Sequence, residues 1–299
     1  MRSAMAAICL FVFVGVSYAG SPEALPDSLP MASFRVETGE VHIQLSAFDK
    51  HNVPVADLTS QELQVVRDGI AIRDVVDLRQ HEELPITATI LTDTSESMGK
   101  SVSIAREGWS WLSANVIRPT DQVELLDFND VVSRPNTGKM VHPHLTSFYD
   151  SLVQLIPEIH KNESGRRALI LFTDGQDTYS YHSLQDVIDT AAREDVVIYA
   201  ITPDIEAVTP NDEVLDRLTT STGGRAFKVA DVEQMIFAGK MIEQDLREGY
   251  ELILRTDKRP AAGARTLAIV APGKNLRLYY RHRYYQPSSR PGAVQMAAR

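Results

Sequence analysis

The feature that most constrains the fold is a regular alternation of apolar and amphipathic segments between Pro85 and about Arg247. Five stretches are rich in apolar residues, and we predict strands at 86–92, 122–128, 167–173, 196–201 and 225–229. The segments between them repeat apolar residues at steps of three and four, which is typical of helices with one buried face. Strands that are apolar throughout are covered on both sides. The pattern predicts an α/β domain with a Rossmann-like, doubly wound, mostly parallel sheet.

The segments on either side of this region have a period of two, which is typical of half-buried strands. Val41, Ile43 and Leu45 alternate with polar neighbours, and Asp68-Gly69 lies between two apolar pairs, which predicts a hairpin. After Gly249 the alternation returns, and further strands are expected at 250–254, 266–270 and 276–280.

Each flank is too small to be stable alone. We therefore expect the N-terminal β segment, residues 34–83, to pair with the C-terminal β segment, residues 248–286, and to form a second, smaller β domain. The α/β domain, residues 84–247, would be inserted between its two halves.

The N-terminal residues predict that the protein is exported, and the C-terminal residues predict a flexible tail. Residues 1–19 contain Arg2, an apolar stretch and two small residues, Ser17 and Ala19, at signal-peptidase spacing, so we expect a signal peptide and a secreted or periplasmic protein. An uncleaved anchor is the alternative, but the apolar stretch is short against the roughly 20 residues of a full span. Residues 20–33, with three prolines, predict a linker, and residues 287–299 a flexible tail.

The charge and the cysteine content of the chain limit the classes of partner and the kinds of stabilisation that we expect. The formal net charge of −10 argues against nucleic acid or an anionic membrane surface as the main partner. The single cysteine, Cys9, lies in the expected signal peptide, so the mature chain would not depend on a disulfide. No later segment is long and apolar enough to predict a membrane span.

A cluster of oxygen-bearing side chains follows the first strand of the α/β region. Asp93, Ser95 and Ser97 are two residues apart, so in an extended turn their side chains can converge on one point. Carboxylate and hydroxyl oxygens suit Mg²⁺, Mn²⁺ or Ca²⁺ better than Zn²⁺ or copper. Three ligands are few for such an ion, and Asp174 and Thr146 are expected to join them, because strand ends of a parallel sheet meet at one edge.

These motifs resemble the von Willebrand factor type A domain. The resemblance rests on Asp93-Thr94-Ser95-Glu96-Ser97, on Thr146 before Phe148-Tyr149-Asp150, and on Thr173-Asp174-Gly175. It implies a metal-ion-dependent adhesion site in which the serines, the threonine and the aspartates hold the ion and an acidic side chain of a protein partner takes the open position. The flanks are similar to those of a bacterial, secreted group of proteins related to this family.

One residue departs from the family pattern. Glu96 stands between the two serines, where the family commonly has glycine. Its carboxylate has three possible consequences: tighter cation binding, occupation of the place of the partner's acid, or a side chain that simply points into water.

Some of these residues, and several others, have alternative interpretations. Ser97 or Ser101 would also serve as an N-cap for the following helix. His142 and His144 could form a metal pair but are more typical of a surface loop. Asp177, Thr178 and Ser180 are expected to shape their loop through hydrogen bonds to the backbone. The tyrosine-rich run 279–285 is expected to form one alternating strand.

The sequence favours binding over catalysis. Aspartate phosphatases carry Asp-x-Asp at a comparable strand end, but here the second position is Ser95, and no Gly-x-Ser-x-Gly elbow is present for a serine hydrolase. We therefore expect no enzyme activity and a metal-dependent protein-binding module. A metal-independent structural protein that assembles a cell-envelope complex is the alternative.

Overall fold

The computed structural model describes residues 40–73, 75–81, 85–129, 131–135, 146–159, 166–206, 208–255 and 263–286. The predicted signal peptide, linker and tail, and the pair His142 and His144, lie outside these residues. All described residues belong to one compact unit, Val36–Arg299. No helix in the described ranges has the length and apolar character needed to cross a membrane.

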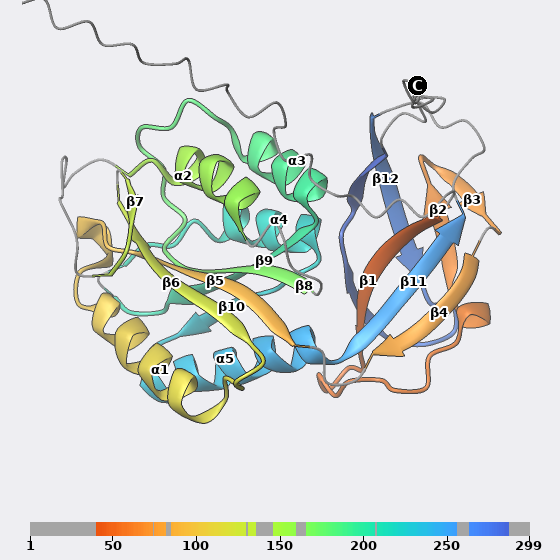
Figure 1. Ribbon diagram of the computed structural model, residues 1–299, viewed down its shortest axis with the longest axis horizontal. Coiled ribbons are helices and arrows are strands. Elements are labelled where there is room, and N and C mark those ends of the chain that lie inside the picture. Colours follow the sequence, from red (N-terminus) through yellow and green to blue (C-terminus); the bar gives the residue numbers. More distant parts are fainter. Residues whose placement is uncertain are drawn as a thin grey trace, which may run out of the picture. The chain divides into compact units, whose positions relative to one another are not determined.

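A six-stranded sheet forms the centre of the α/β region (Figure 1). Its strands lie in the order β10-β9-β8-β5-β6-β7. Five are parallel and β7 is antiparallel to its neighbour β6. The bounds are β5 (Ile86–Asp93), β6 (Gln122–Phe128), β7 (Val132–Ser133), β8 (Arg166–Phe172), β9 (Val196–Pro203) and β10 (Ala226–Val229). Every residue of β5 is buried, including three threonines and Asp93.

Helices cover both faces of this sheet, as Figure 1 shows. On one face lie α1 (Ser101–Asn115) and α5 (Val232–Arg247), and on the other α2 (Phe148–Leu155), α3 (Leu184–Glu194) and α4 (Asp212–Thr222). Each helix buries its apolar stripe, exemplified by Trp109 and Leu112 of α1 against Met235 and Ile242 of α5. The predicted doubly wound fold is confirmed.

The direction of winding changes between β5 and β8. The chain passes from β5 through α1 to β6 on one side, and from β8 through α3 to β9 on the other. In open α/β sheets, ligands bind outside the carboxyl ends of the strands at such a switch point. Asp93 ends β5, and Thr173 and Asp174 follow β8 directly, so the predicted site residues from both strands lie at this position.

The flanking segments form two antiparallel sheets, with strand orders β13-β1-β11-β4 and β14-β12-β2-β3. In both sheets, strands from before the α/β region pair with strands from after it: β1 with β11 and β13, and β2 with β12. The bounds are β1 (Glu40–Phe48), β2 (Gln64–Arg67), β3 (Ile70–Ile72), β4 (Val75–His81), β11 (Gly249–Arg255), β12 (Gly263–Val270), β13 (Arg277–Tyr280) and β14 (Arg283–Gln286). The smaller β domain of the predicted fold is present. Its residue boundaries stay predictions.

Of two local predictions for these sheets, the hairpin is confirmed and the single strand over 279–285 is wrong. Asp68 and Gly69 both have positive φ and join β2 to β3 as a hairpin. The run 279–285 is not one alternating strand, because the chain leaves one sheet after Tyr280 and enters the other at Arg283. Tyr280 and Tyr284 are nevertheless both buried in the same apolar core, which explains the aromatic pattern.

The β sheets contact the α/β region at the end of α4. Gly223 ends α4 with φ +92°, and a Cβ atom there would lie 2.8 Å from the backbone nitrogen of Arg281. Beside it, the buried guanidinium of Arg225 stacks on Phe48 and Tyr279, with its centre 4.5 Å and 5.2 Å from the two ring centroids. Asp245 of α5 neutralises Arg225 through a 2.7 Å ion pair. Side chains from both regions therefore build this contact.

Candidate metal centre at the carboxyl ends of the strands

Asp93 is the most buried member of the candidate site. Its side chain has no solvent exposure, and its Oδ2 accepts a 2.7 Å hydrogen bond from the hydroxyl of Thr173. Its Oδ1 accepts a 2.9 Å bond from the backbone N–H of Ser95. These bonds fix the carboxylate between the ends of β5 and β8, and the link to Thr173 is a contact that sequence reasoning missed.

Asp174 lies beside this carboxylate. It is 1% exposed, and its negative charge contributes to the electrostatic environment of Asp93. Its Oδ1 accepts a 3.0 Å bond from the backbone N–H of Gln176, and its carbonyl oxygen accepts one from Asn211. No ion pair to Asp93 or Asp174 is formed within the described part of the chain.

Burial raises the pKa of Asp93 to about 6, and the neighbouring charge of Asp174 adds to this shift, although hydrogen bonds from Ser95 and Thr173 act in the opposite direction. The metal-free protein therefore bears the free-energy cost of two carboxylates that are held close together away from water.

Thr146 lies over the end of β5. Its carbonyl oxygen accepts bonds from the N–H groups of Thr178 and Tyr179 in the loop after β8. The next residue, Ser147, donates its N–H to the carbonyl of Asn129, directly after β6. Because β5 lies between β6 and β8, these two attachments place Thr146 next to the strand end that carries Asp93.

Ser95 and Ser97 lie on the turn that follows β5. Their hydroxyl oxygens are 3.1 Å apart; Ser95 is buried and Ser97 is exposed. Glu96 is exposed in the same short 3₁₀ turn, Glu96–Met98. The structure thus brings all five predicted ligand positions to one edge of the sheet.

The alternative reading of Ser97 and Ser101 as N-caps is wrong. Lys100 is the N-cap residue of α1 and makes no side-chain capping bond. Gly99, with φ +45°, turns the chain before the helix, so Ser97 lies outside it and Ser101 is its first residue. The hydroxyl of Ser101 instead donates to the carbonyl oxygen of Met98.

The loop after Asp174 is held by side chains, as expected. Asp177 accepts the N–H of Phe148, the first residue of α2, at 2.8 Å and also binds the N–H and hydroxyl of Ser180. Asp150 of α2 accepts the N–H groups of Tyr181 and His182. This network fixes the loop against Thr146 and α2.

The fixed loop presents two tyrosine rings to solvent. Tyr179 is 55% exposed and Tyr181 is 88% exposed, and the rings meet edge to face with centroids 6.2 Å apart. The backbone of Tyr179 contacts Thr146 directly, so this pair lies beside the candidate site. Sequence reasoning missed it, and the signal was present: two tyrosines in a polar loop at a strand end.

The donors fit a hard divalent cation. They are two carboxylates and three hydroxyls, all oxygen, which is the chemistry that Mg²⁺, Mn²⁺ and Ca²⁺ prefer. Among the described residues, no group of three or more His, Cys, Asp or Glu side chains is placed to hold a metal. Any cation at the strand ends would therefore depend on the hydroxyl groups as well as on Asp93 and Asp174.

The sheet order and the helices on both faces define a doubly wound α/β domain with oxygen-bearing side chains at its switch point. The sequence profile of the von Willebrand factor type A domain matches residues 146–243, so the chain contains a domain of this family. The match includes Thr146 and Asp174; Asp93, Ser95 and Ser97 precede it and are brought to them by the pairing of β5 with β8. No curated protein sequence matches this chain.

Several solved structures are similar in fold. Proximal thread matrix protein 1 from the mussel byssus is 16% identical with a TM-score of 0.46, over 60% of this chain and 51% of that one, so this chain spans about half its length. An aerotolerance-related membrane protein from Bacteroides fragilis is 14% identical with a TM-score of 0.44, over 54% and 98%. A von Willebrand factor type A protein from Catenulispora acidiphila is 10% identical with a TM-score of 0.43, over 84% and 74%.

Proposed function

We propose that this protein is a secreted or periplasmic binding module that recognises a protein partner through a divalent cation. The cation would be held by Asp93, Ser95, Ser97, Thr146 and Asp174. One observation carries the proposal: two buried carboxylates lie at the ends of adjacent strands, at the switch point of the sheet, with no basic partner in the described residues.

A bound cation would remove the cost of this arrangement. Buried carboxylates are stabilised by an opposite charge, and removal of that charge is strongly unfavourable. Two carboxylates and three hydroxyls would supply five oxygens, so a six-coordinate cation would keep one position for a further oxygen ligand. It would supply a positive centre for an Asp or Glu of the partner, in a charge-assisted contact.

The exposed tyrosine pair supports a protein as the partner. Tyrosine is enriched at the centre of protein interfaces, because its ring buries a large area and loses little conformational freedom. Tyr179 and Tyr181 lie on a loop that hydrogen bonds already fix, so their ordering would add little to the cost of binding. We infer that a partner places its acidic side chain at the cation and packs a neighbouring side chain on these rings.

Chemistry on a substrate is not part of the proposal. A mechanism like that of the aspartate phosphatases needs a second acid at position 95, and the chain has Ser95 there.

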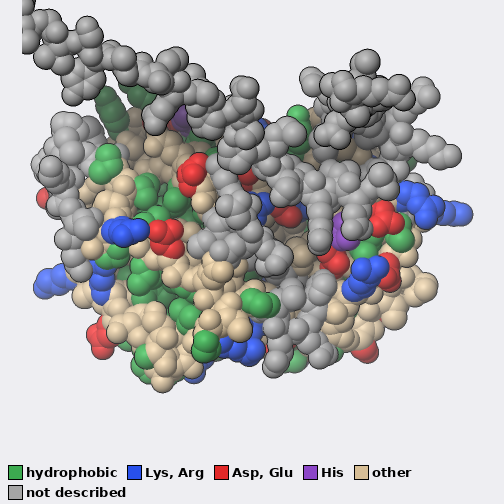
Figure 2. Space-filling view, viewed as in Figure 1, with side chains coloured by type: hydrophobic (Ala, Val, Ile, Leu, Met, Phe, Trp, Pro, Cys, Tyr) green, Lys and Arg blue, Asp and Glu red, His purple; other side chains and the backbone are tan. Residues whose placement is uncertain are grey.

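On the surface shown in Figure 2, acidic and basic side chains are interspersed over the described residues. Recognition would therefore depend on the local charge of the site more than on a long-range field.

The test is a calorimetric titration of residues 20–299 with Mg²⁺ and with Mn²⁺ after removal of bound metal. Saturable binding that Asp93→Ala and Asp174→Ala both abolish would support the site. Asp77→Ala, at an exposed carboxylate paired with Arg79, is the matched control and should leave metal binding unchanged.

Absence of binding up to millimolar metal would contradict the proposal for the free protein. A metal-independent assembly role in the cell envelope would then lead. That role predicts partner binding that resists both chelator and Asp93→Ala.

A further inference from the structure

Two segments beside the candidate metal centre are joined by hydrogen bonds in both directions. The first, residues 146–150, leads into α2, and the second is the loop 175–183, which carries the tyrosine pair. The hydroxyl of Thr178 accepts the N–H of Thr146 at 2.8 Å, and the carbonyl oxygen of Thr146 accepts the N–H of Thr178 at 3.0 Å. Each segment therefore supplies acceptors to the other.

The first turn of α2 depends on this loop. The first N–H groups of a helix have no partner within it, and they are commonly bound by the side chain of the N-cap residue. Ser147, the N-cap residue of α2, makes no such bond within the described residues. Instead, the carboxylate of Asp177 accepts the N–H of Phe148 at 2.8 Å, and the hydroxyl of Ser180 accepts that of Asp150 at 3.1 Å. The loop therefore caps the helix.

Polar contacts hold the loop, and hydrophobic burial contributes little. Residues 176–183, all of which the structure describes, are exposed or half-buried. A further attachment is Asp150, whose carboxylate accepts the N–H groups of Tyr181 and His182 at 3.1 Å and 2.9 Å. Segments with few buried contacts open at a low free-energy cost while the rest of a protein stays folded. The position of the tyrosine pair therefore depends on these hydrogen bonds.

The candidate ligands Asp174 and Thr146 belong to the two sides of this attachment. Asp174 directly precedes the loop, and Thr146 begins the segment that holds it. Joint coordination of one cation by the two residues would link the segments, so the cation would bind the attached state more tightly than the released state. A ligand with such a preference shifts the equilibrium toward the state that it binds. The expected effect is a loop that leaves α2 less often.

We propose that Asp177 is a positioning residue that couples cation binding to the presentation of the tyrosine pair. This inference rests on the proposed function, since it needs a cation at Asp174 and Thr146. Cation binding and loop attachment favour each other by the same factor, as thermodynamic linkage requires. A protein partner would gain affinity from the cation in two ways: through its acidic side chain, and through tyrosine rings that are already in place.

Hydrogen exchange, measured by mass spectrometry on residues 20–299, follows the loop directly. In the metal-free protein, Asp177→Ala should speed exchange in peptides that cover 146–150 and 175–183 by about tenfold or more, because the bonds of Asp177 to Phe148 and Ser180 are lost. Saturating Mg²⁺ should slow exchange in the parent and restore much of the lost protection in the variant. A carboxylate that only stabilises the fold would not produce this metal-dependent recovery.

Calorimetric titration gives the reciprocal effect. If Asp177→Ala releases the loop in most molecules, part of the binding free energy of Mg²⁺ is used to reattach it, and we expect affinity to fall by about fivefold or more. Asp177→Asn keeps a carbonyl oxygen as acceptor for the N–H of Phe148 and should lie between the parent and Asp177→Ala in both measurements. Ser180→Ala, which removes the acceptor of the Asp150 N–H, keeps the test valid if Asp177→Ala does not fold.

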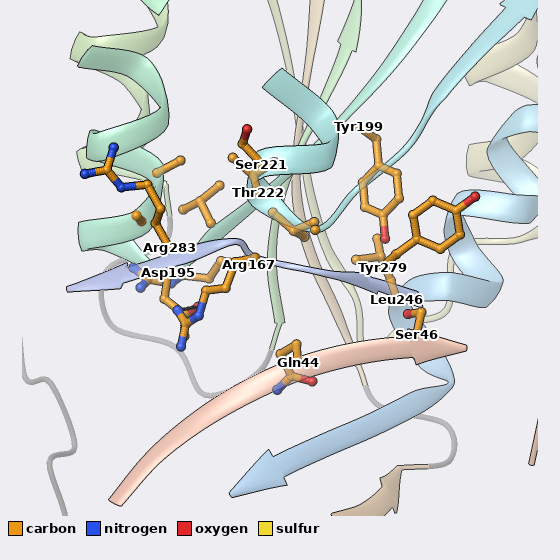
Figure 3. Close-up of a pocket in the computed structure, with 16 residues that line it drawn as sticks. Gln44, Ser46, Arg167, Asp195, Tyr199, Ser221, Thr222, Leu246, Tyr279 and Arg283 are labelled. Carbon is orange, nitrogen blue, oxygen red and sulfur yellow. Dashed lines mark hydrogen bonds and ion pairs between the residues drawn. The ribbon is translucent and has the colours of Figure 1, made fainter. Parts of the chain in front are cut away.

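Asp195→Asn is the matched control. Asp195 lies at the opposite, amino-terminal end of the strands, where it lines a cavity of about 60 Å³ together with Arg167 (Figure 3). Its half-exposed carboxylate pairs with Arg281, so the variant also loses a charged contact between distant segments. It should leave Mg²⁺ affinity and exchange in the loop unchanged.

The outcomes separate this proposal from the proposed function. Saturable Mg²⁺ binding in the parent, with loop exchange that Mg²⁺ does not slow, would overturn the coupling and leave the metal site intact. Loop exchange in the metal-free protein that is the same in the parent and in Asp177→Ala would overturn the role of Asp177. Absence of Mg²⁺ binding in the parent would overturn both the coupling and the proposed function.

Discussion

The hydroxyl of Thr173 donates a 2.7 Å hydrogen bond to Oδ2 of Asp93 and joins the ends of β8 and β5. The same hydroxyl accepts the N–H of Gly175 at 3.0 Å. One buried oxygen therefore positions both the carboxylate of Asp93 and the turn that carries Asp174.

Thr173→Val should destabilise the protein and weaken metal binding. The substitution keeps the shape of the side chain but leaves an oxygen of Asp93 and the N–H of Gly175 without this partner, at a cost of about 1–3 kcal/mol. Denaturant unfolding measures the stability. Thr173→Ser retains the hydroxyl and should lose much less; a Thr173→Val variant that loses no stability would show that the hydrogen bond does not contribute.

Asp93→Asn should have opposite effects on the metal-free and the metal-bound protein. Without metal, the variant should be more stable by about 1–3 kcal/mol, because a fully buried charge next to Asp174 is removed. With Mg²⁺ present, the parent should gain stability and the variant should not. Thermal unfolding with and without Mg²⁺ tests both effects, and a variant that Mg²⁺ still stabilises would exclude Asp93 as a ligand.

Acid should weaken the attachment of α5 to β5. Burial alone would raise the pKa of Asp121, but its bonds with Arg247 and with the N–H groups of Ile86 and Arg118 lower that pKa below its ordinary value of 3.8. A carboxyl group with a lowered folded-state pKa stabilises the protein above its unfolded-state pKa, and this contribution is lost as pH falls through the folded-state value.

Asp121→Asn should therefore reduce stability at neutral pH and flatten the loss of stability below about pH 4. Unfolding midpoints measured from pH 2 to pH 7 test this. Asp77→Asn serves as control, because the pKa of Asp77 is also lowered by hydrogen bonding but its side chain is exposed. Parallel pH curves for the parent and Asp121→Asn would refute the prediction.

Gly223→Ala should destabilise the contact between α4 and the β sheets. The new Cβ would lie 2.8 Å from backbone atoms of Arg281 and Tyr280, and the residue would keep a φ of +92°. We expect a loss of more than about 1 kcal/mol. Gly273→Ala separates the two causes, because Gly273 has φ +80° with no atom within 4 Å. Similar losses in both variants would leave backbone strain as the sole explanation.

The sequence by itself determined the classes of structure and the placement of the candidate ligands at the strand ends. A strand with an apolar run such as 168–172 of β8 must be covered on both faces, so the doubly wound sheet follows from hydrophobic burial. The position of Asp93 and Asp174 directly after two such strands was sufficient to place them at one edge of the sheet. The Asp68-Gly69 hairpin follows equally from local backbone preference.

Only the tertiary structure decided which distant groups meet. The bond from Thr173 to Asp93 and the exposure of the tyrosine pair beside Thr146 depend on packing between segments far apart in the chain. The change of sheet between Tyr280 and Arg283 has the same origin, because both partner strands lie at the other end of the sequence. The periodicity of the sequence predicts which side chains are buried. Which helices and strands pack against one another depends on the fit between whole elements.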